Sequence, residues 1–313
     1  DGSTTKTVEG VGTYTVAADG TVTFTPETEF TGTAPAVTVV REDVNGTKAS
    51  ATYTPTVTPV TPTTSPATSK DIQGATQTGK PVFTEGDSRV PMNDAVPATF
   101  DDGSTTKTVD GVGTYTVAAD GTVTFVPEPN FVGTAPAVTV VREDKNGTKA
   151  YATYTPTVTP VTLTPTNKVS EDIQNVPQTE TQTFALSNDE TAQITSKKLI
   201  DPATGQPTAE TTVTVAGEGT YTIDPTTGAV TFTPEKDFVG IATGVTVQAT
   251  ATITNAAGKT ATITSDATYT PTVVAAVPTA QPASSKDIQG APQTVTPLFA
   301  GPTVQGNGQE KPV

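Results

Sequence analysis

The chain contains no cysteine, no histidine and no tryptophan among its 313 residues. Without cysteine no disulfide can stabilise the fold, and the sequence gives no sign of the redox compartment. Without histidine, a Ser-His-Asp triad, a His-based zinc site and a histidine general base are all excluded. There is also no Gly-rich phosphate loop of the Walker type.

Basic residues are scarce as well. The chain has 17 Lys and Arg against 32 Asp and Glu, a formal net charge of −15, spread thinly along the sequence. An acidic surface argues against nucleic acid as a partner and against docking on anionic lipid. No apolar run reaches the ~18 residues that a membrane helix needs, and no signal peptide is visible. Any export signal or anchor of a parent protein is therefore expected outside these residues.

What the chain does contain is repetition. The segment DGSTTKTV begins at Asp1 and again at Asp102, and only seven positions differ between residues 1–60 and 102–161. A third, more diverged copy follows, and the opening of a fourth closes the chain. A period of about 100 residues is the size of a whole domain, so the sequence predicts a tandem array of domains.

The tripeptide DIQ marks the copies, at Asp71, Asp172 and Asp287, and the unequal intervals show that the third copy carries 14 extra residues. The extra residues enter at expected loops and hairpins, where insertions are tolerated. We expect a truncated repeat at 1–65, a complete repeat at 66–165, a complete repeat with insertions at 166–281, and the start of a further repeat at 282–313. The Pro- and Thr-rich junctions between them favour polyproline II spacers or, equally, last strands that run straight into the next domain.

The composition predicts an all-β fold. Threonine supplies 73 residues, and 27 Pro and 26 Gly bound short runs of alternating polarity. Residues 114–125 and 137–158 each predict a hairpin, the second with Asn146 and Gly147 both at positive φ in a type I′ turn. Shorter strands are expected at 80–84, 96–100 and 105–109. Seven or so antiparallel strands per repeat fit an Ig-like β-sandwich, with a small barrel as the alternative.

Aromatic residues recur at equivalent places. Of 10 Phe and 7 Tyr, all but Phe100 and Tyr151 have a counterpart in another copy. Rings on one face of a strand and threonines on the other are typical of a half-buried strand, so we expect the rings in the domain cores. Few are left to build a stacking platform for sugars or single-stranded nucleic acid.

Two carboxylate pairs are candidates for glycoside hydrolysis, Asp101 with Asp102 and Glu143 with Asp144. Their surroundings indicate instead that the first pair lies in a solvated loop and the second pair beside a hairpin turn. Asn93 and Asp94, together with the first pair, offer oxygen ligands for calcium, but the third copy has no matching cluster. Turn-forming Asp and Asn explain them more simply.

Two sequence patterns bear on covalent modification. A Lys–Asn isopeptide bond through Lys107 or Lys149 needs burial to shift the reacting groups' pKa values, and the third copy has Val213 in place of Lys107. The glycosylation patterns at Asn45 and Asn146 are explained by turns. We therefore assign no catalytic, cofactor-binding or metal-binding residue.

The run from Gly111 to Val161, GVGTYTVAADGTVTFVPEPNFVGTAPAVTVVREDKNGTKAYATYTPTVTPV, closely resembles CshA-type fibril repeats of the wall-anchored fibrillar adhesins of streptococci. The resemblance covers the first two copies and, more loosely, the third. The shorter pattern DGTVTF…P…FVG is also similar to bacterial cadherin-like domains.

The resemblance implies a structural region that forms the shaft of a surface fibril on a Gram-positive bacterium, with no enzymatic activity. Such a shaft is extracellular, is anchored to the cell wall through a part not present in this chain, and supports biofilm growth. It projects an adhesive region toward host matrix proteins such as fibronectin, or toward other microbes. The alternative is that the repeats bind ligands themselves, through hairpin tips at Arg41 and Arg142 or through acidic joints.

The two ends of the chain are complementary. The first repeat here lacks the part equivalent to Asp71–Asp101, and Asp287–Val313 carries nearly that same part. Head-to-tail self-association by strand donation is therefore a hypothesis, against the alternative of an arbitrary boundary.

Overall fold

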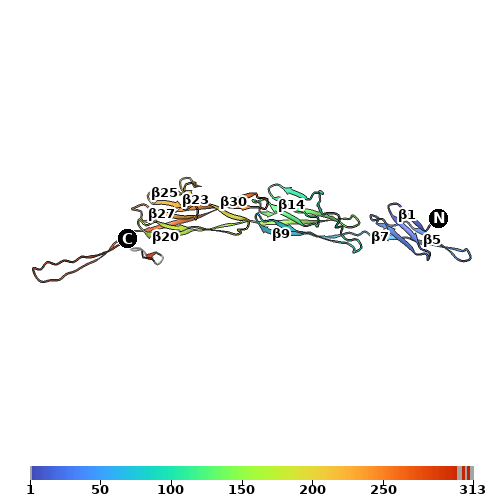
Figure 1. The fold of residues 1–313 in the computed structure, drawn as a ribbon, viewed down its shortest axis with the longest axis horizontal. Helices are drawn as coiled ribbons and strands as arrows, with labels where there is room; N and C mark the ends of the chain where they lie inside the picture. The colour runs from blue at the N-terminus through green and yellow to red at the C-terminus, as the bar shows by residue number, and fades with distance from the viewer. Residues whose placement is uncertain (1, 302–304, 307–308, 311–313) are drawn as a thin grey trace. The chain divides into compact units, whose positions relative to one another are not determined.

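The computed structural model describes residues 2–301, 305–306 and 309–310. Every regular element in this part of the chain is a β-strand, which confirms the all-β prediction. The chain divides into two compact units, the first made of Asp1–Asp71 with Thr76–Val158, the second of Ile72–Ala75 with Thr159–Val313 (Figure 1). No helix in the described part could cross a membrane.

The first repeat, within unit 1, is built from short antiparallel hairpins. A three-stranded sheet has the order β1 (Thr5–Val8), β2 (Gly12–Val16), β3 (Val22–Pro26). Two further pairs are β4 (Gly32–Thr33) with β7 (Thr56–Val57), and β5 (Val37–Glu42) with β6 (Lys48–Tyr53).

The second repeat, also in unit 1, is a sandwich of two sheets rather than a barrel. One sheet has the order β10-β15-β14-β13, from β10 (Gln77–Gly79), β13 (Thr106–Val109), β14 (Gly113–Val117) and β15 (Val123–Pro127). The other has the order β12-β17-β18-β16 with β9 also on β18, from β9 (Ala67–Ile72), β12 (Thr99–Phe100), β16 (Gly133–Thr134), β17 (Val138–Glu143) and β18 (Lys149–Thr159). A separate antiparallel pair is formed by β8 (Thr63–Ser65) and β11 (Val82–Thr84).

The third repeat, in unit 2, has the same plan. Its smaller sheet has the order β21 (Gln178–Thr181), β27 (Ala229–Pro234), β26 (Gly219–Ile223), β25 (Thr212–Val215). Its larger sheet has the order β20 (Lys168–Ile173), β30 (Thr260–Val274), β29 (Val245–Thr254), β23 (Ala192–Asp201), β24 (Gln206–Pro207), with β28 (Gly240–Ile241) on β30.

The remaining strands form separate pairs. They are β19 (Leu163–Thr166) with β22 (Thr183–Leu186), β31 (Thr279–Gln281) with β32 (Leu298–Ala300), and β33 (Gln305–Gly306) with β34 (Gln309–Glu310).

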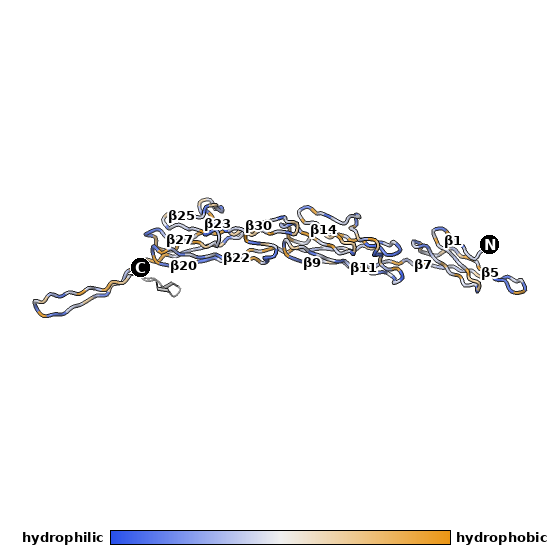
Figure 2. Tube along the Cα trace, in the orientation of Figure 1, coloured by the Kyte–Doolittle hydropathy of each residue, from blue (hydrophilic) through white to orange (hydrophobic). Residues whose placement is uncertain are grey.

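The core of each complete repeat lies between its two sheets. Tyr115 and Phe125 face each other across β14 and β15 with ring centroids 4.6 Å apart, and both are fully buried. Figure 2 shows apolar and polar residues alternating along the strands, the pattern expected of sheets with one buried face. The prediction that the recurrent rings fill the cores is confirmed in the complete repeats. Phe100 is also in the core, whereas Tyr151 is exposed.

Three details differ from the sequence-based expectation. The pairing of β20 with β30 is parallel, so the sheets are not wholly antiparallel. Much of the third copy's insertion lengthens two strands: β17 and β18 pair over six residues, β29 and β30 over ten. The type I′ turn is wrong, because Gly147 has φ of 81° while Asn146 is not among the described residues with positive φ. The loop is a type I turn followed by a left-handed glycine, a common three-residue hairpin connection.

Candidate functional site

The first carboxylate pair is engaged by a lysine. Lys107 Nζ lies 3.3 Å from Asp101 Oδ1 and 4.0 Å from Asp102 Oδ2, and all three side chains are partly exposed. A pair that is solvated and neutralised in this way lacks the apolar environment that keeps a general acid protonated. The loop interpretation of this pair therefore agrees with the geometry.

The second pair lies beside a hairpin turn, as the sequence predicts, but the expectation that both carboxylates are solvated is wrong for Asp144. Asp144 is fully buried, and its Oδ1 accepts hydrogen bonds of 2.9 Å from the backbone N–H groups of Asn146 and Thr148. Asp43 makes the same two bonds in the first repeat, and in the third repeat Asn255 takes this place. The carboxylate holds the hairpin tip closed.

The four candidate calcium ligands do not converge. Asn93 N donates to Glu143 O, and Asp101 N donates to Thr139 O. Glu143 and Thr139 are four residues apart along β17, a separation of about 13 Å in a strand. Asp94 is paired with Arg142 at 2.6 Å. Across the described residues, no three Asp, Glu, His or Cys side chains lie close enough to hold a metal ion together.

Both hairpin-tip arginines bond within their own repeat, although Arg41 is exposed and Arg142 is largely buried. The Arg142 side chain is only 12% exposed, and Arg41 Nη1 donates to Asp19 O at 2.7 Å. The lysines considered for an isopeptide bond are also in the wrong surroundings, since Lys107 lies beside carboxylates and Lys149 is exposed. Neither is in the buried environment that the crosslinking chemistry requires.

A buried hydrogen-bond chain ties the two sheets of each complete repeat together, and we name it the Ser–Gln–Tyr trio. In unit 1, Ser69 Oγ lies 2.6 Å from Tyr154 Oη and donates to Gln77 Oε1 at 2.5 Å, while Gln77 Nε2 donates to Thr157 O at 3.0 Å. Gln77 and Tyr154 are both buried, and each polar group in the chain has a partner. A fully satisfied buried network rigidifies a core and specifies one arrangement of it.

Unit 2 repeats the trio with Ser170, Gln178 and Tyr269. Ser170 Oγ donates to Gln178 and lies 2.7 Å from Tyr269 Oη, and Gln178 Nε2 donates to Thr272 O at 2.9 Å. Burial raises the pKa of Tyr269 to about 12. Comparison of the copies could have found the signal, because serine and glutamine stand eight positions apart around each DIQ.

The glutamine of DIQ itself is a second buried polar residue. Gln73 N donates to Thr159 O at 2.8 Å, and Gln73 Oε1 accepts from Val161 N at 3.1 Å. Thr191 Oγ1 donates to Gln73 O at 2.8 Å, so the segment Ile72–Ala75 is part of the packing of unit 2. Gln174 repeats the first two bonds, to Val274 and Ala276.

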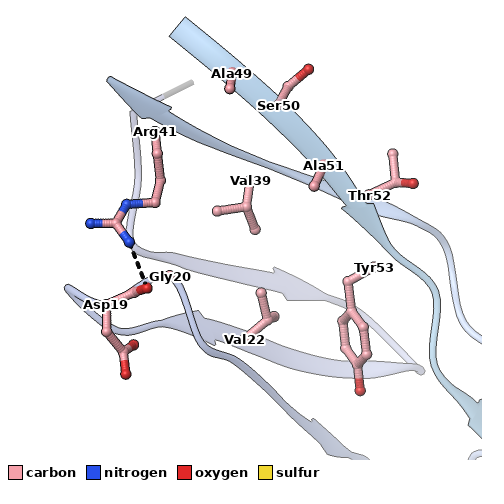
Figure 3. A pocket seen from close by; sticks show the side chains of 10 residues that line it. All are labelled: Asp19, Gly20, Val22, Val39, Arg41, Ala49, Ser50, Ala51, Thr52 and Tyr53. Atoms are coloured by element: carbon pink, nitrogen blue, oxygen red, sulfur yellow. Dashed lines mark hydrogen bonds between the residues drawn. The ribbon is translucent and has the colours of Figure 1, made fainter. Parts of the chain in front are cut away.

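The first repeat contains an open hollow of about 390 Å³. Figure 3 shows Val22, Val39 and Tyr53 pointing into it from β3, β5 and β6. Tyr53 is 37% exposed, whereas its counterpart Tyr154 is fully buried. The hollow is therefore the core of a sandwich with one side uncovered.

A family model described as the surface adhesin CshA repetitive domain matches the chain three times, at residues 1–57, 59–158 and 160–273. The chain belongs to this family. The solved structure of repeat domain 13 of the fibrillar adhesin CshA from Streptococcus gordonii is 56% identical, over 22% of this chain and 90% of that one, with a TM-score of 0.15. The resemblance to CshA-type repeats is thereby confirmed. Membership places the chain among the repeats of surface adhesins.

Solved structures of cadherins also match. Drosophila N-cadherin EC1-3 is 14% identical over 84% of this chain and 85% of that one, with a TM-score of 0.28. Mouse cadherin-23 EC22-24 is 12% identical over 85% and 83%, with a TM-score of 0.31. No curated protein matches the chain.

Proposed function

We propose that this chain is a shaft region of a fibrillar adhesin, a structural spacer with no catalytic activity. The observation that carries the proposal is that each complete repeat has a core of its own. One apolar cluster is drawn from residues of the second repeat, and a separate one from the third repeat together with Leu163. A small further cluster packs Ile72 and Val161 against Ala192 and Ile253 where the two repeats follow one another along the chain. The proposed repeat boundaries, 66–165 and 166–281, each enclose a complete Ser–Gln–Tyr trio.

The surface chemistry supports a spacer rather than a binding module. The hairpin-tip arginines are held by Asp94 and by the Asp19 backbone, and the outward face of the strands is largely threonine. Such a surface is soluble and carries little that could anchor a specific partner, since binding hot spots are enriched in aromatic and arginine side chains. We infer that a parent protein places the array outside a Gram-positive cell, anchored to the wall and contributing to biofilm.

The test separates spacing from binding. Cells carrying a parent adhesin with two repeats removed, or two added, are measured for attachment under flow to fibronectin and to partner microbes. If the repeats are spacers, attachment should fall when repeats are removed and rise when they are added. Attachment lost by removing two repeats should return when two repeats are put back in a different order. In parallel, the isolated chain is passed over immobilised fibronectin. Saturable binding by the chain would overturn the spacer role in favour of repeats that bind ligand.

A further inference from the structure

The first and the last strand of the larger sheet in the third repeat lie side by side. β20 pairs with the end of β30 over six residue pairs, from Lys168 with Tyr269 to Ile173 with Val274, and the two strands are parallel. The chain therefore enters this ladder at Lys168 and leaves it at the opposite end, at Val274. A pull on the two flanking segments slides β20 along β30 and loads all the pairs together. An antiparallel pairing would bring the two pulled ends together and open one pair at a time.

Amide side chains extend the ladder past both of its ends. Before the first pair, Asn167 Oδ1 accepts a hydrogen bond of 2.9 Å from Thr268 N. After the last pair, Gln174 N donates to Val274 O at 3.0 Å, and Gln174 Oε1 accepts from Ala276 N at 3.1 Å. Side chains therefore add to the backbone pairing at the two ends, which are the places where a pull first acts.

The middle of the ladder is held from the core side. Ser170 Oγ lies 2.7 Å from Tyr269 Oη, and Gln178 Nε2 of the smaller sheet donates to Thr272 O of β30 at 2.9 Å. Ile173 and Tyr269 are fully buried, so water does not reach this face to replace a broken bond. A slide of one residue, about 3.3 Å along the strand, separates the two hydroxyl groups and puts β20 out of register with the core. The pairs are therefore expected to hold or to fail together.

We propose that the parallel pairing of β20 with β30 is a force-bearing clamp, which keeps the third repeat folded while the chain is under tension. The clamp rests on the proposed spacer function, because a shaft that holds a cell against flow transmits the pull through every repeat. The rate of forced unfolding, rather than the equilibrium stability, decides whether a repeat survives such a pull. The second repeat makes the same contacts, since Ser69 Oγ lies 2.6 Å from Tyr154 Oη and Gln73 N donates to Thr159 O at 2.8 Å.

The direction of the pull provides the test. The chain contains no cysteine, so introduced cysteines give defined attachment points for optical tweezers on the full chain. Thr166→Cys with Ala275→Cys loads the ladder from opposite ends. Pro177→Cys with Ala275→Cys applies the load at one end only, where the turn after β20 lies beside the end of β30. The side chains at all three positions are exposed.

The two pairs of attachment points are compared at equal force. The third repeat is expected to unfold more than about tenfold more slowly under the first pair, because two net hydrogen bonds loaded together already supply that factor. Equal rates, or faster unfolding under the first pair, would overturn the clamp. The measurement involves no ligand and no cell, so the clamp and the spacer function can fail independently: a repeat that binds fibronectin can still resist a pull, and a spacer can unfold easily.

A matched pair of variants locates the barrier. Asn167→Ala removes a side-chain bond at the end of the ladder, and Asn255→Ala removes two at the tip of the β29–β30 hairpin, outside the ladder. Under the first pair of attachment points, Asn167→Ala is expected to speed unfolding by about fivefold, the value of one hydrogen bond.

Asn255→Ala is expected to leave that rate unchanged, although it destabilises the third repeat in a denaturant titration. The reason is that a contact still formed in the transition state does not affect the rate of unfolding. If both variants accelerate forced unfolding alike, the barrier does not lie in the ladder and the proposal is refuted.

Discussion

Replacing Tyr154 by phenylalanine isolates the hydroxyl that closes the second repeat. The ring stays in the core, and only the bond to Ser69 Oγ, 2.6 Å in the structure, is lost. Ser69 still donates to Gln77, so no other buried group loses its partner. A buried hydrogen bond contributes about 1 kcal/mol to the free energy of unfolding. We therefore expect unit 1 to lose about that amount.

Native-state hydrogen exchange is the assay, because it reports the free energy of opening for each region separately. A loss of about 1 kcal/mol corresponds to about fivefold faster exchange of the most protected amides of β18. Amides of β30, in unit 2, are the internal reference and should not change. Tyr269→Phe should give the converse result, with faster exchange in β30 and unchanged exchange in β18.

Tyr53→Phe is the control within the same chain, because Tyr53 has the same flanking residues as Tyr154 but no serine partner. In Tyr53→Phe, exchange in β5 and β6 should not change. Ser69→Ala should cost more than Tyr154→Phe, because it leaves both the tyrosine hydroxyl and the side-chain oxygen of Gln77 without their partner, whereas Gln77 Nε2 keeps its bond to Thr157 O. The reasoning is refuted if Tyr154→Phe and Tyr53→Phe accelerate exchange alike, or if Ser69→Ala is the milder change.

The other predictions concern Gly113 at the start of β14, Asp144 at the hairpin tip, Gln73 of the DIQ tripeptide, and alkaline pH. Gly113→Ala places a Cβ 2.5 Å from a backbone oxygen at φ of 154°, and should destabilise unit 1 in a denaturant titration by more than 3 kcal/mol, roughly the upper range for overpacking. Gly111→Ala, with φ of 70° and open space, should cost only about 1–2 kcal/mol. Asp144→Ala should cost about 2 kcal/mol by loss of two charge-assisted bonds, whereas Asp144→Asn should keep nearly full stability in the same titration. Gln73→Ala removes the acceptor of the buried Val161 N–H. It should destabilise unit 2 by about 1–3 kcal/mol, the cost of an unsatisfied buried donor, and leave unit 1 unchanged. Hydrogen exchange in β29 measures the effect. Burial raises the folded pKa of Tyr269 to about 12 and also raises that of Tyr221 in the same unit. The unfolded chain therefore ionises first above pH 10, and each of the two tyrosines should lower the stability of unit 2 by up to about 1.4 kcal/mol per pH unit between pH 10 and 12. Chemical denaturation across that range measures the loss, which Tyr269→Phe should reduce, and a flat profile contradicts it.

Local pattern was sufficient to find the long strands. The run from Thr114 to Phe125 alternates aromatic or valine with threonine, and it forms β14 and β15 in register. Shorter elements were less well placed. The strand expected at 80–84 is divided, because Pro81 has no N–H for a ladder, so β10 ends at Gly79 and β11 begins at Val82. Of the strand expected at 96–100 only Thr99–Phe100 pairs.

The elements that the sequence did not yield are those fixed by distant partners. The parallel pairing of β20 with β30 joins Ser170 to Tyr269, 99 positions apart, and no local periodicity encodes the direction of such a pairing. Asp144 likewise looks like a loop residue, and Asp43, which closes the same tip in the first repeat, is exposed. In the second repeat the distant segment around Met92 pairs beside Asp144, which is buried there. Comparison of the repeats reveals part of this long-range contact, which local periodicity does not. The diverged third copy keeps the serine, the glutamine and the tyrosine while many of its other residues change. Three polar residues retained together amid such change indicate a shared contact, whereas the strand direction that brings them together requires the three-dimensional structure.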